Sequence, residues 1–231
     1  MAAVAAYAEE SRVRAIVESI PAADPAPLGL AGFALTTFLL SGHNASFIPD
    51  GIWVGPAFFY GGLAQLTAGM WEFRNRNVFG ATAFSTYGGF WMGLGIFVVL
   101  AVVSKSFGTA LAGANLPNAV AWFLVAFAIF NTYMLLWSTQ VSVAVFLVFL
   151  TLEVTEIVLA VGNFMEAHGH ANSGWVHTGG WLGIATAAVA WYASASGVIN
   201  GMKGRPVLPV GAPLSLEGGR IGRPMPRGRH A

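Results

Sequence analysis

The stretch Asp24-Pro25-Ala26-Pro27-Leu28-Gly29-Leu30 opens the first long apolar segment of the chain and predicts a helix start there. Asp24 is a good N-cap, because its carboxylate accepts hydrogen bonds from backbone N–H groups that lack a partner in the first turn. Pro25 and Pro27 fall within that turn, where a missing N–H costs little. Two interpretations remain open: a well-capped helix, or a glycine-lined mouth where the positive end of the helix dipole attracts a small anion.

Long stretches beyond this segment carry no charge. Hydrophobic residues make up 56% of the chain and charged residues 9%, whereas a soluble domain has about a quarter charged residues. Each uncharged interval holds apolar runs long enough to cross a bilayer, which takes about 20 helical residues. We therefore expect an all-α polytopic membrane protein. The predicted spans are 27–48, 52–71, 81–104, 118–138, 140–164 and 175–202.

The chain divides into three predicted regions: 1–23, 24–203 and 204–231. The first has apolar residues on one helical face and suits an interfacial helix on the membrane, with a frayed terminus as the alternative. The second contains the spans, and the third is a Pro-, Gly- and Arg-rich tail. The apolar face of the first region consists of Val13, Ile16, Val17 and Ile20.

Basic residues predict the orientation of the spans. With both termini cytoplasmic, Lys105 is the one basic residue outside, which agrees with the positive-inside rule. We expect a multi-pass protein of the inner or plasma membrane whose tail arginines contact lipid headgroups rather than nucleic acid. The cytoplasmic basic residues are Arg12, Arg14, Arg74, Arg76, Lys203, Arg205, Arg220, Arg223, Arg227 and Arg229.

Local patterns add detail to the predicted helices. The short turn at 138–140 makes the fourth and fifth spans antiparallel neighbours, and Asn115 with Pro117 predicts a capped start for the fourth. Small residues let helices approach closely in lipid, so we expect most glycine clusters to serve packing. These glycines are Gly61, Gly62, Gly88, Gly89, Gly93, Gly179, Gly180 and Gly183.

Together with later motifs, the opening heptapeptide resembles the acetate uptake transporters, also called succinate–acetate permeases. The resemblance runs from Asp24 to about Gly211 and implies six transmembrane helices per protomer around a pore, a homo-hexamer, and passage of acetate or succinate with protons. The further matching motifs are Thr36-Thr37, His43-Asn44, Phe59-Tyr60-Gly61-Gly62-Leu63-Ala64-Gln65, Ala68-Gly69, Phe79-Gly80, Thr82-Ala83-Phe84, Tyr87-Gly88, Phe90-Trp91, Gly162-Asn163, Gly180-Trp181 and Val207-Leu208-Pro209.

The resemblance also implies a hydrophobic constriction of the pore. Carried over by motif position, it consists of Phe33, Tyr87 and Leu152. Asp24 departs from the family pattern, where Asn is usual, and adds negative charge at the expected anion mouth.

Helical periodicity places polar groups on the same faces as the constriction residues. Phe33, Thr37, Leu40 and Asn44 share one face of the first span; Tyr87, Trp91, Leu94 and Val98 share one face of the third; and Val145, Leu152, Glu156, Leu159 and Asn163 share one face of the fifth. On the second span, Gln65, Glu72 and Phe58 share a face. Helix packing alone also produces such stripes. The predicted pore-lining residues are Leu30, Thr37, Asn44, Gln65, Trp91 and Asn163.

Two carboxyl groups, Glu153 and Glu156, lie near the middle of the fifth span. Ionisable groups there are expensive and usually functional. We expect Glu156 to face the path and Glu153 to point towards a neighbouring helix or subunit. The hypothesis is that Glu156 exchanges a proton during transport, and the alternative is a protonated pair that makes structural interhelical hydrogen bonds.

The outer loop between the fifth and sixth spans carries His168, His170 and His177 near Glu166. The spacing matches no recognised metal motif, so we expect no metal site, although zinc binding and pH sensing are the alternatives to a solvated loop.

The sequence therefore predicts a transporter for acetate and other short carboxylates, with no cofactor and no enzyme site. No Lys or Arg lies within a span, so weak hydrogen-bond donors would hold a monocarboxylate, and we rank acetate above succinate. The alternatives are a passive anion channel, an ammonia exporter or, from another class, a membrane receptor.

Overall fold

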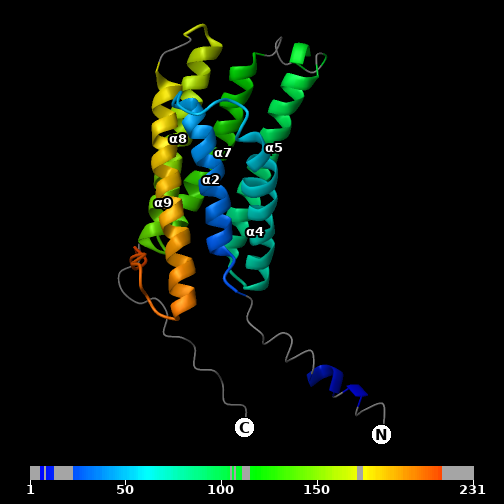
Figure 1. The fold of residues 1–231 in the computed structure, drawn as a ribbon, viewed down its shortest axis with the longest axis vertical. Coiled ribbons are helices and arrows are strands. Elements are labelled where there is room, and N and C mark those ends of the chain that lie inside the picture. Colours follow the sequence, from blue (N-terminus) through cyan, green and yellow to red (C-terminus); the bar gives the residue numbers. More distant parts are fainter. Residues whose placement is uncertain are drawn as a thin grey trace.

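The computed structural model describes residues 6–7, 9–12, 23–104, 106, 108–110, 115–170 and 174–214. Within these residues, five helices are long and apolar enough to cross a membrane (Figure 1). The predicted interfacial face at residues 13–20, Lys105, Arg14 and the four tail arginines from 220 onward lie outside the described residues. The five helices are α2 (Ala26–Asn44), α5 (Val78–Val103), α7 (Leu116–Ser138), α8 (Val143–Ala167) and α9 (Trp175–Lys203).

The predicted second span is divided into three consecutive helical segments: α3 (Val54–Phe58), η1 (Phe59–Ala64) and α4 (Gln65–Arg74). The middle segment is a π-helix, a form that is rare and frequent at functional sites. Its wider turn breaks the regular helical period between Phe58 and Gln65, on which the prediction of one face shared by Phe58, Gln65 and Glu72 depended. The Phe58 ring lies beside Gly95 of α5.

Two helix starts differ from the prediction. The helix α2 begins at Ala26 with Pro25 as its N-cap, so Asp24 is one position further out, although its Oδ1 still accepts from Ala26 N at 2.9 Å. Asn115 does precede α7, but its side chain makes no cap and donates to the Ala167 carbonyl at 2.6 Å. Its φ is positive, at 62°, and this turns the amide away from the α7 N-terminus.

The helices pack as neighbours in the order α7, α8, α9 and α2, while α4 packs on α5. The turn between α7 and α8 confirms that these two helices are antiparallel neighbours. At Gly180 in α9 the backbone of α2 comes so close that a Cβ would lie 2.5 Å from Ala45 N. At Gly89 a Cβ would meet no described atom within 4 Å, and at Gly93 it would meet one ring atom at 4.0 Å, so close packing within the protomer does not require these two glycines.

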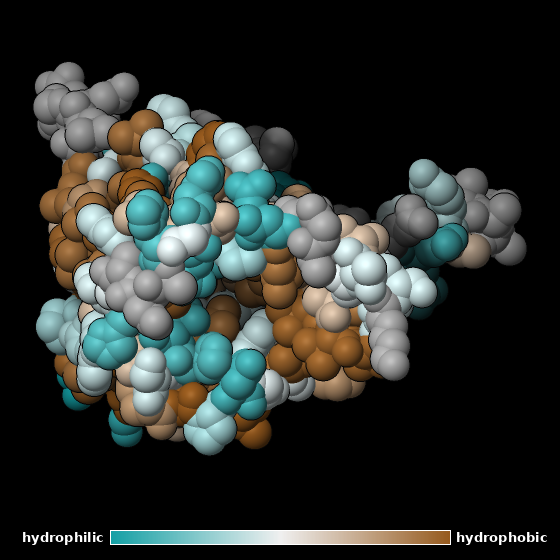
Figure 2. Space-filling view, turned by 90° about the horizontal axis from the view of Figure 1, so that it is seen from above, coloured by the Kyte–Doolittle hydropathy of each residue, from teal (hydrophilic) through white to brown (hydrophobic). Residues whose placement is uncertain are grey.

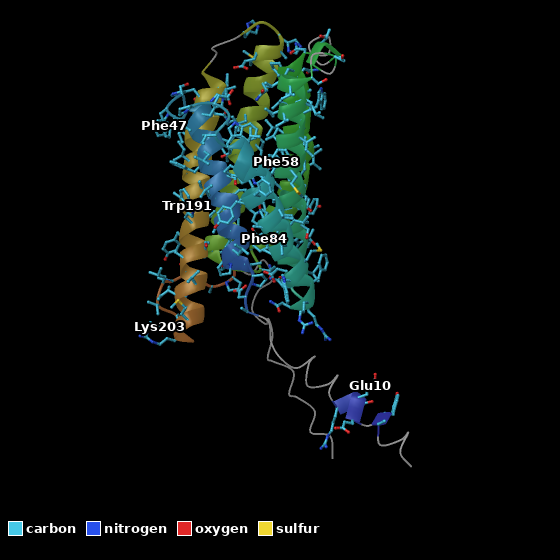
Figure 3. All side chains as sticks on the ribbon, turned by 45° about the vertical axis from the view of Figure 1, so that its right-hand side comes forward. Glu10, Phe47, Phe58, Phe84, Trp191 and Lys203 are labelled. Atoms are coloured by element: carbon cyan, nitrogen blue, oxygen red, sulfur yellow. The ribbon has the colours of Figure 1, made fainter. Side chains whose placement is uncertain are left out.

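The start of α2 and the end of α9 lie at the same end of the bundle, at the bottom of Figure 1. Figure 3 places Lys203 at this end of α9, with Trp191 and Phe47 further up the same side of the molecule. The aromatic rings of Phe47 and Trp181 stack with centroids 5.6 Å apart, which fastens the loop after α2 to α9.

Residues 205–211 fold back across the start of α8 and the last turns of α9 and form a strap. Asn200 holds the strap with three hydrogen bonds: its Oδ1 accepts from Val207 N at 2.7 Å and Leu208 N at 3.0 Å, and its Nδ2 donates to Leu208 O at 2.9 Å. The carbonyl of Val210 accepts from Ala144 N at 2.8 Å and so satisfies a free N–H in the first turn of α8.

We expect Asn200→Ala to release the strap, because each of the three lost hydrogen bonds contributes about 1 kcal/mol. Limited proteolysis in detergent should then cut between residues 205 and 214 markedly faster than in the wild type. Asn200→Asp keeps the two accepted hydrogen bonds and loses the donated one, so its cleavage rate should lie between those of the wild type and Asn200→Ala. Equal cleavage rates in the wild type and Asn200→Ala would contradict the role of Asn200.

Candidate functional site: two cavities inside the helix bundle

A cavity of about 480 Å³ lies among the later halves of α2, α5 and α8 and is lined also by residues of the loop after α2. Four predicted pore-lining residues face it: Thr37, Asn44, Trp91 and Asn163. The view from above shows hydrophilic side chains gathered over it, whereas the flanks are largely hydrophobic (Figure 2). We call this space the outer cavity.

A second cavity, of about 80 Å³, lies towards the start of α2, and we call it the inner cavity. The remaining two predicted pore-lining residues, Leu30 and Gln65, face it, as does Ala26 of the heptapeptide. The heptapeptide is held from two sides: Pro27 O accepts from Ser194 Oγ of α9 at 2.6 Å, and Gly29 packs against the ring of Phe84, which is labelled in Figure 3.

Among the described residues, three line both cavities, and they are Phe33, Tyr87 and Leu152. All three are buried, at 4%, 3% and 6% exposure, so none of them faces the outside of the protomer. The rings of Phe33 and Tyr87 meet edge to face with centroids 5.8 Å apart. The two cavities therefore adjoin at one narrow apolar ring.

Polar atoms without a protein partner concentrate on residues that line the cavities. In the outer cavity these atoms are Thr37 Oγ1, Trp91 Nε1 and Glu156 Oε2, and in the inner cavity they are Gln65 Oε1 and Glu72 Oε1. A buried polar group left without a partner costs about 1–3 kcal/mol. These residues therefore carry unused hydrogen-bonding capacity at the lining of the two cavities.

The two membrane-buried glutamates belong to one hydrogen-bonded network. Tyr87 Oη lies 2.8 Å from Asn131 Oδ1 and 3.4 Å from Glu156 Oε1. Asn131 Nδ2 donates to Glu153 Oε2 at 2.7 Å, and Thr132 Oγ1 lies 2.7 Å from Glu153 Oε1. Glu156 thus faces the outer cavity, whereas Glu153 turns towards α7.

The rim of the outer cavity carries further titratable groups. His43 Nε2 lies 3.6 Å from Asp50 Oδ1, and Glu166 also lines the cavity. Within the described residues, no group of three or more His, Cys, Asp or Glu side chains lies close enough together to hold a metal ion. His168 Nδ1 instead lies 2.7 Å from Phe164 O of its own helix.

The predicted pore-lining residues omit two members of the site, although the sequence analysis placed one of them, Glu72, on the same face as Gln65. Asn131 is fully buried at the junction of α5, α7 and α8, and Glu72 lines the inner cavity with 1% exposure. Asn131 stands in an otherwise apolar helix, and a buried amide in a membrane span is a signal that could have identified it. Glu72 sits close to the predicted membrane boundary, where a carboxyl group draws less attention.

Comparison with known proteins gives consistent matches. Residues 10–211 match the model of the GPR1/FUN34/yaaH family. The chain is 40% identical to Acetate permease A of Emericella nidulans over 84% of this chain and 67% of that one. It is 37% identical to the Succinate-acetate/proton symporter SatP of Escherichia coli over 82% of this chain and 95% of that one. The solved structure of the bacterial acetate channel SatP superposes with a TM-score of 0.74 at 36% identity, covering 82% of this chain and 99% of that one.

Proposed function

The chain belongs to the GPR1/FUN34/yaaH family, and from this premise we propose that it transports acetate across a membrane through a path inside each protomer. Relatives named as an acetate permease and a succinate–acetate/proton symporter support this substrate class. Other short carboxylates, including succinate, are weaker candidates.

The observation that carries the proposal is the meeting of the two cavities at Phe33, Tyr87 and Leu152. A solute that leaves the outer cavity must pass these three apolar side chains to reach the inner one. Hydrophobic constrictions gate conduction by excluding water. The three residues are therefore proposed as the constriction that admits a small weak acid.

The unpartnered groups of the outer cavity suit a carboxylate. The Trp91 indole N–H only donates, and the Thr37 hydroxyl can donate, so both can bond carboxylate oxygens. No Lys or Arg lines either cavity among the described residues. Binding is therefore weak and divided among several donors, as conduction requires. This favours a monocarboxylate over a dicarboxylate.

The carboxyl groups of the path support coupling to protons. Glu156 lines the outer cavity and Glu72 the inner one, and one carboxyl oxygen of each, Oε2 and Oε1 respectively, has no protein partner. An ionised carboxylate repels an acetate ion, whereas a shared proton turns the repulsion into a hydrogen bond. We assign proton exchange to Glu156, with Glu153 as its neighbour in the network.

The proposed assembly is a six-span protomer with both termini in the cytoplasm of an inner or plasma membrane. In this arrangement α3, η1 and α4 together form the second span, which brings the number of spans to six. The basic residues Arg74 and Lys203 lie at the ends of α4 and α9, as the positive-inside rule requires for a cytoplasmic end. Assembly as a homo-hexamer follows from the family resemblance.

The test is uptake of labelled acetate by proteoliposomes under imposed pH and voltage gradients, with protein-free liposomes as background. Uptake against an acetate gradient, driven by protons, is the expected result. Uptake that only follows the acetate gradient would instead indicate a passive channel. Flux of ammonia without flux of acetate would indicate an ammonia exporter. Binding without flux would favour a receptor.

Glu156→Gln is expected to lose the stimulation by an inward proton gradient, because an amide cannot release a proton, while downhill acetate flux persists. The initial rate with the gradient should fall to the rate without it. Glu166→Gln is the matched control, since Glu166 lines the same cavity near the end of the same helix. An unchanged pH profile in Glu156→Gln would remove this residue from the mechanism.

A further inference from the structure

The side chain of Asn131 has a single orientation that its neighbours allow. It is fully buried in α7, at 0% exposure, and its Nδ2 lies 2.9 Å from the carbonyl oxygen of Phe149 and 2.7 Å from Glu153 Oε2. A backbone carbonyl only accepts hydrogen bonds, so the amide NH₂ must face it. Asn131 Oδ1 therefore faces Tyr87 and must accept the phenol proton across 2.8 Å.

This orientation limits what Tyr87 can offer to Glu156. A phenol hydroxyl carries one proton. While Tyr87 donates this proton to Asn131, its oxygen can form a hydrogen bond with Glu156 Oε1, 3.4 Å away, only as the acceptor. The donor must then be a protonated Glu156. An ionised Glu156 would compete with Asn131 for the phenol proton, and a hydrogen bond to a charged acceptor is roughly twice as strong as a neutral one.

We infer that Asn131 is a positioning residue that directs the proton of the Tyr87 hydroxyl away from Glu156. It thereby links the protonation of Glu156 to the hydrogen bonds of Tyr87, a side chain that separates the two cavities. The inference rests on the proposed function, in which Glu156 exchanges protons. With Glu156 protonated, Tyr87 is bonded on both sides and its ring is held at the constriction. Loss of the proton turns the O–H bond towards Glu156 and breaks its hydrogen bond to Asn131, so that the Phe127 and Phe130 rings alone hold Tyr87 to α7.

Glu153 holds Asn131 in place for this task. Its two carboxyl oxygens lie 2.7 Å from Asn131 Nδ2 and 2.7 Å from Thr132 Oγ1, so both are bonded to α7. Glu153 is partly exposed, whereas Glu156 is buried at 2% exposure. The two glutamates therefore differ in role: one fixes the amide, and the other faces the solute.

Other titratable groups could also influence Glu156. Glu153 lies on its own helix, Tyr87 faces it from α5, and Tyr133 of α7 lies beside Tyr87, with rings that both contact Phe130. The outer cavity adds His43, Asp50 and Glu166. From α9, Thr186 presents a neutral hydroxyl 3.2 Å from Thr155 Oγ1. Of the described groups, only Tyr87 bonds both Asn131 and Glu156.

The test compares the pH profile of acetate uptake in proteoliposomes of the wild type and Asn131→Leu, corrected for protein-free liposomes. Leucine removes the acceptor, so Tyr87 donates to the Glu156 carboxylate and favours its ionised form. The pH of half-maximal uptake should fall by about one unit, the effect of a single hydrogen bond to a charged group. Asn131→Thr, whose hydroxyl can still accept from Tyr87, should restore the wild-type profile.

An equal loss of rate at every pH, with no shift, would overturn the inference and leave Asn131 a structural role. The double variant Asn131→Leu with Glu156→Gln should show no shift, because the titrating group is gone. If Asn131→Leu does not fold, the pH profile of Tyr87→Phe tests the inference. A lower or unchanged pH of half-maximal uptake agrees with it. A higher pH of half-maximal uptake would show that Tyr87 donates to Glu156 in the wild type and would overturn the inference. Absence of uptake by the wild type would instead refute the proposed function.

Discussion

Leu152→Trp is expected to reduce acetate uptake to near the level of protein-free liposomes. Leu152 lies in α8 between the two cavities and is 6% exposed, so a larger side chain has no direction to turn except into the path. The edge-to-face contact of Phe33 and Tyr87 closes the opposite side. A loss of at least about tenfold in rate corresponds to an added barrier of roughly 1.4 kcal/mol, a modest value for a steric block.

The control for this variant is Leu150→Trp, two residues away on the same helix and 36% exposed on the outside of the protomer. It should transport at the wild-type rate. Leu152→Ala provides the opposite change and should raise the uptake of butyrate relative to acetate, because it widens the same ring. Wild-type rates in a well-folded Leu152→Trp would show that acetate does not pass between these residues.

Gly180→Ala is expected to prevent stable packing of α9 on α2. The added Cβ would lie 2.5 Å from Ala45 N, 2.7 Å from Ser41 O and 2.8 Å from Asn44 C, all of them backbone atoms that cannot rotate away. Overpacking of this kind costs about 1–3 kcal/mol, and the rigid neighbours favour the upper end. The measurement is the yield of monodisperse protein in detergent and its melting temperature.

Gly201→Ala is the matched control in the same helix. Its Cβ would meet nothing within 4 Å, and alanine stabilises an exposed helix by roughly 0.5–1 kcal/mol relative to glycine. This variant should melt at or above the wild-type temperature. A melting temperature for Gly180→Ala equal to that of Gly201→Ala would contradict the close approach of α2 and α9.

The helices and their faces follow from the sequence. Uncharged apolar runs determined where the long helices lie, within a few residues of the observed bounds. The period of the α-helix also determined that Phe33, Thr37 and Asn44 share one face, and the structure places all three at the outer cavity. Periodicity of one helix is a local property, which is why the residues alone could predict it.

Only the tertiary structure shows where the irregular segment η1 lies and which helices pack against one another. The π-helix between α3 and α4 interrupts the regular helical period, and Gly32 of α2 packs directly against its backbone at Tyr60. A single helix cannot contain that information. The extra backbone width is tolerated only where a glycine on a neighbouring helix leaves room for it.

The sequence by itself determined that this chain forms apolar helices with carboxyl groups buried among them. Only the tertiary structure decided that Asn131 of α7 stands between Tyr87 and Glu153. The physical reason is that hydrophobic spacing specifies which side of a helix turns inward. The order, depth and rotation at which helices meet depend instead on side-chain packing between segments that are far apart in the chain.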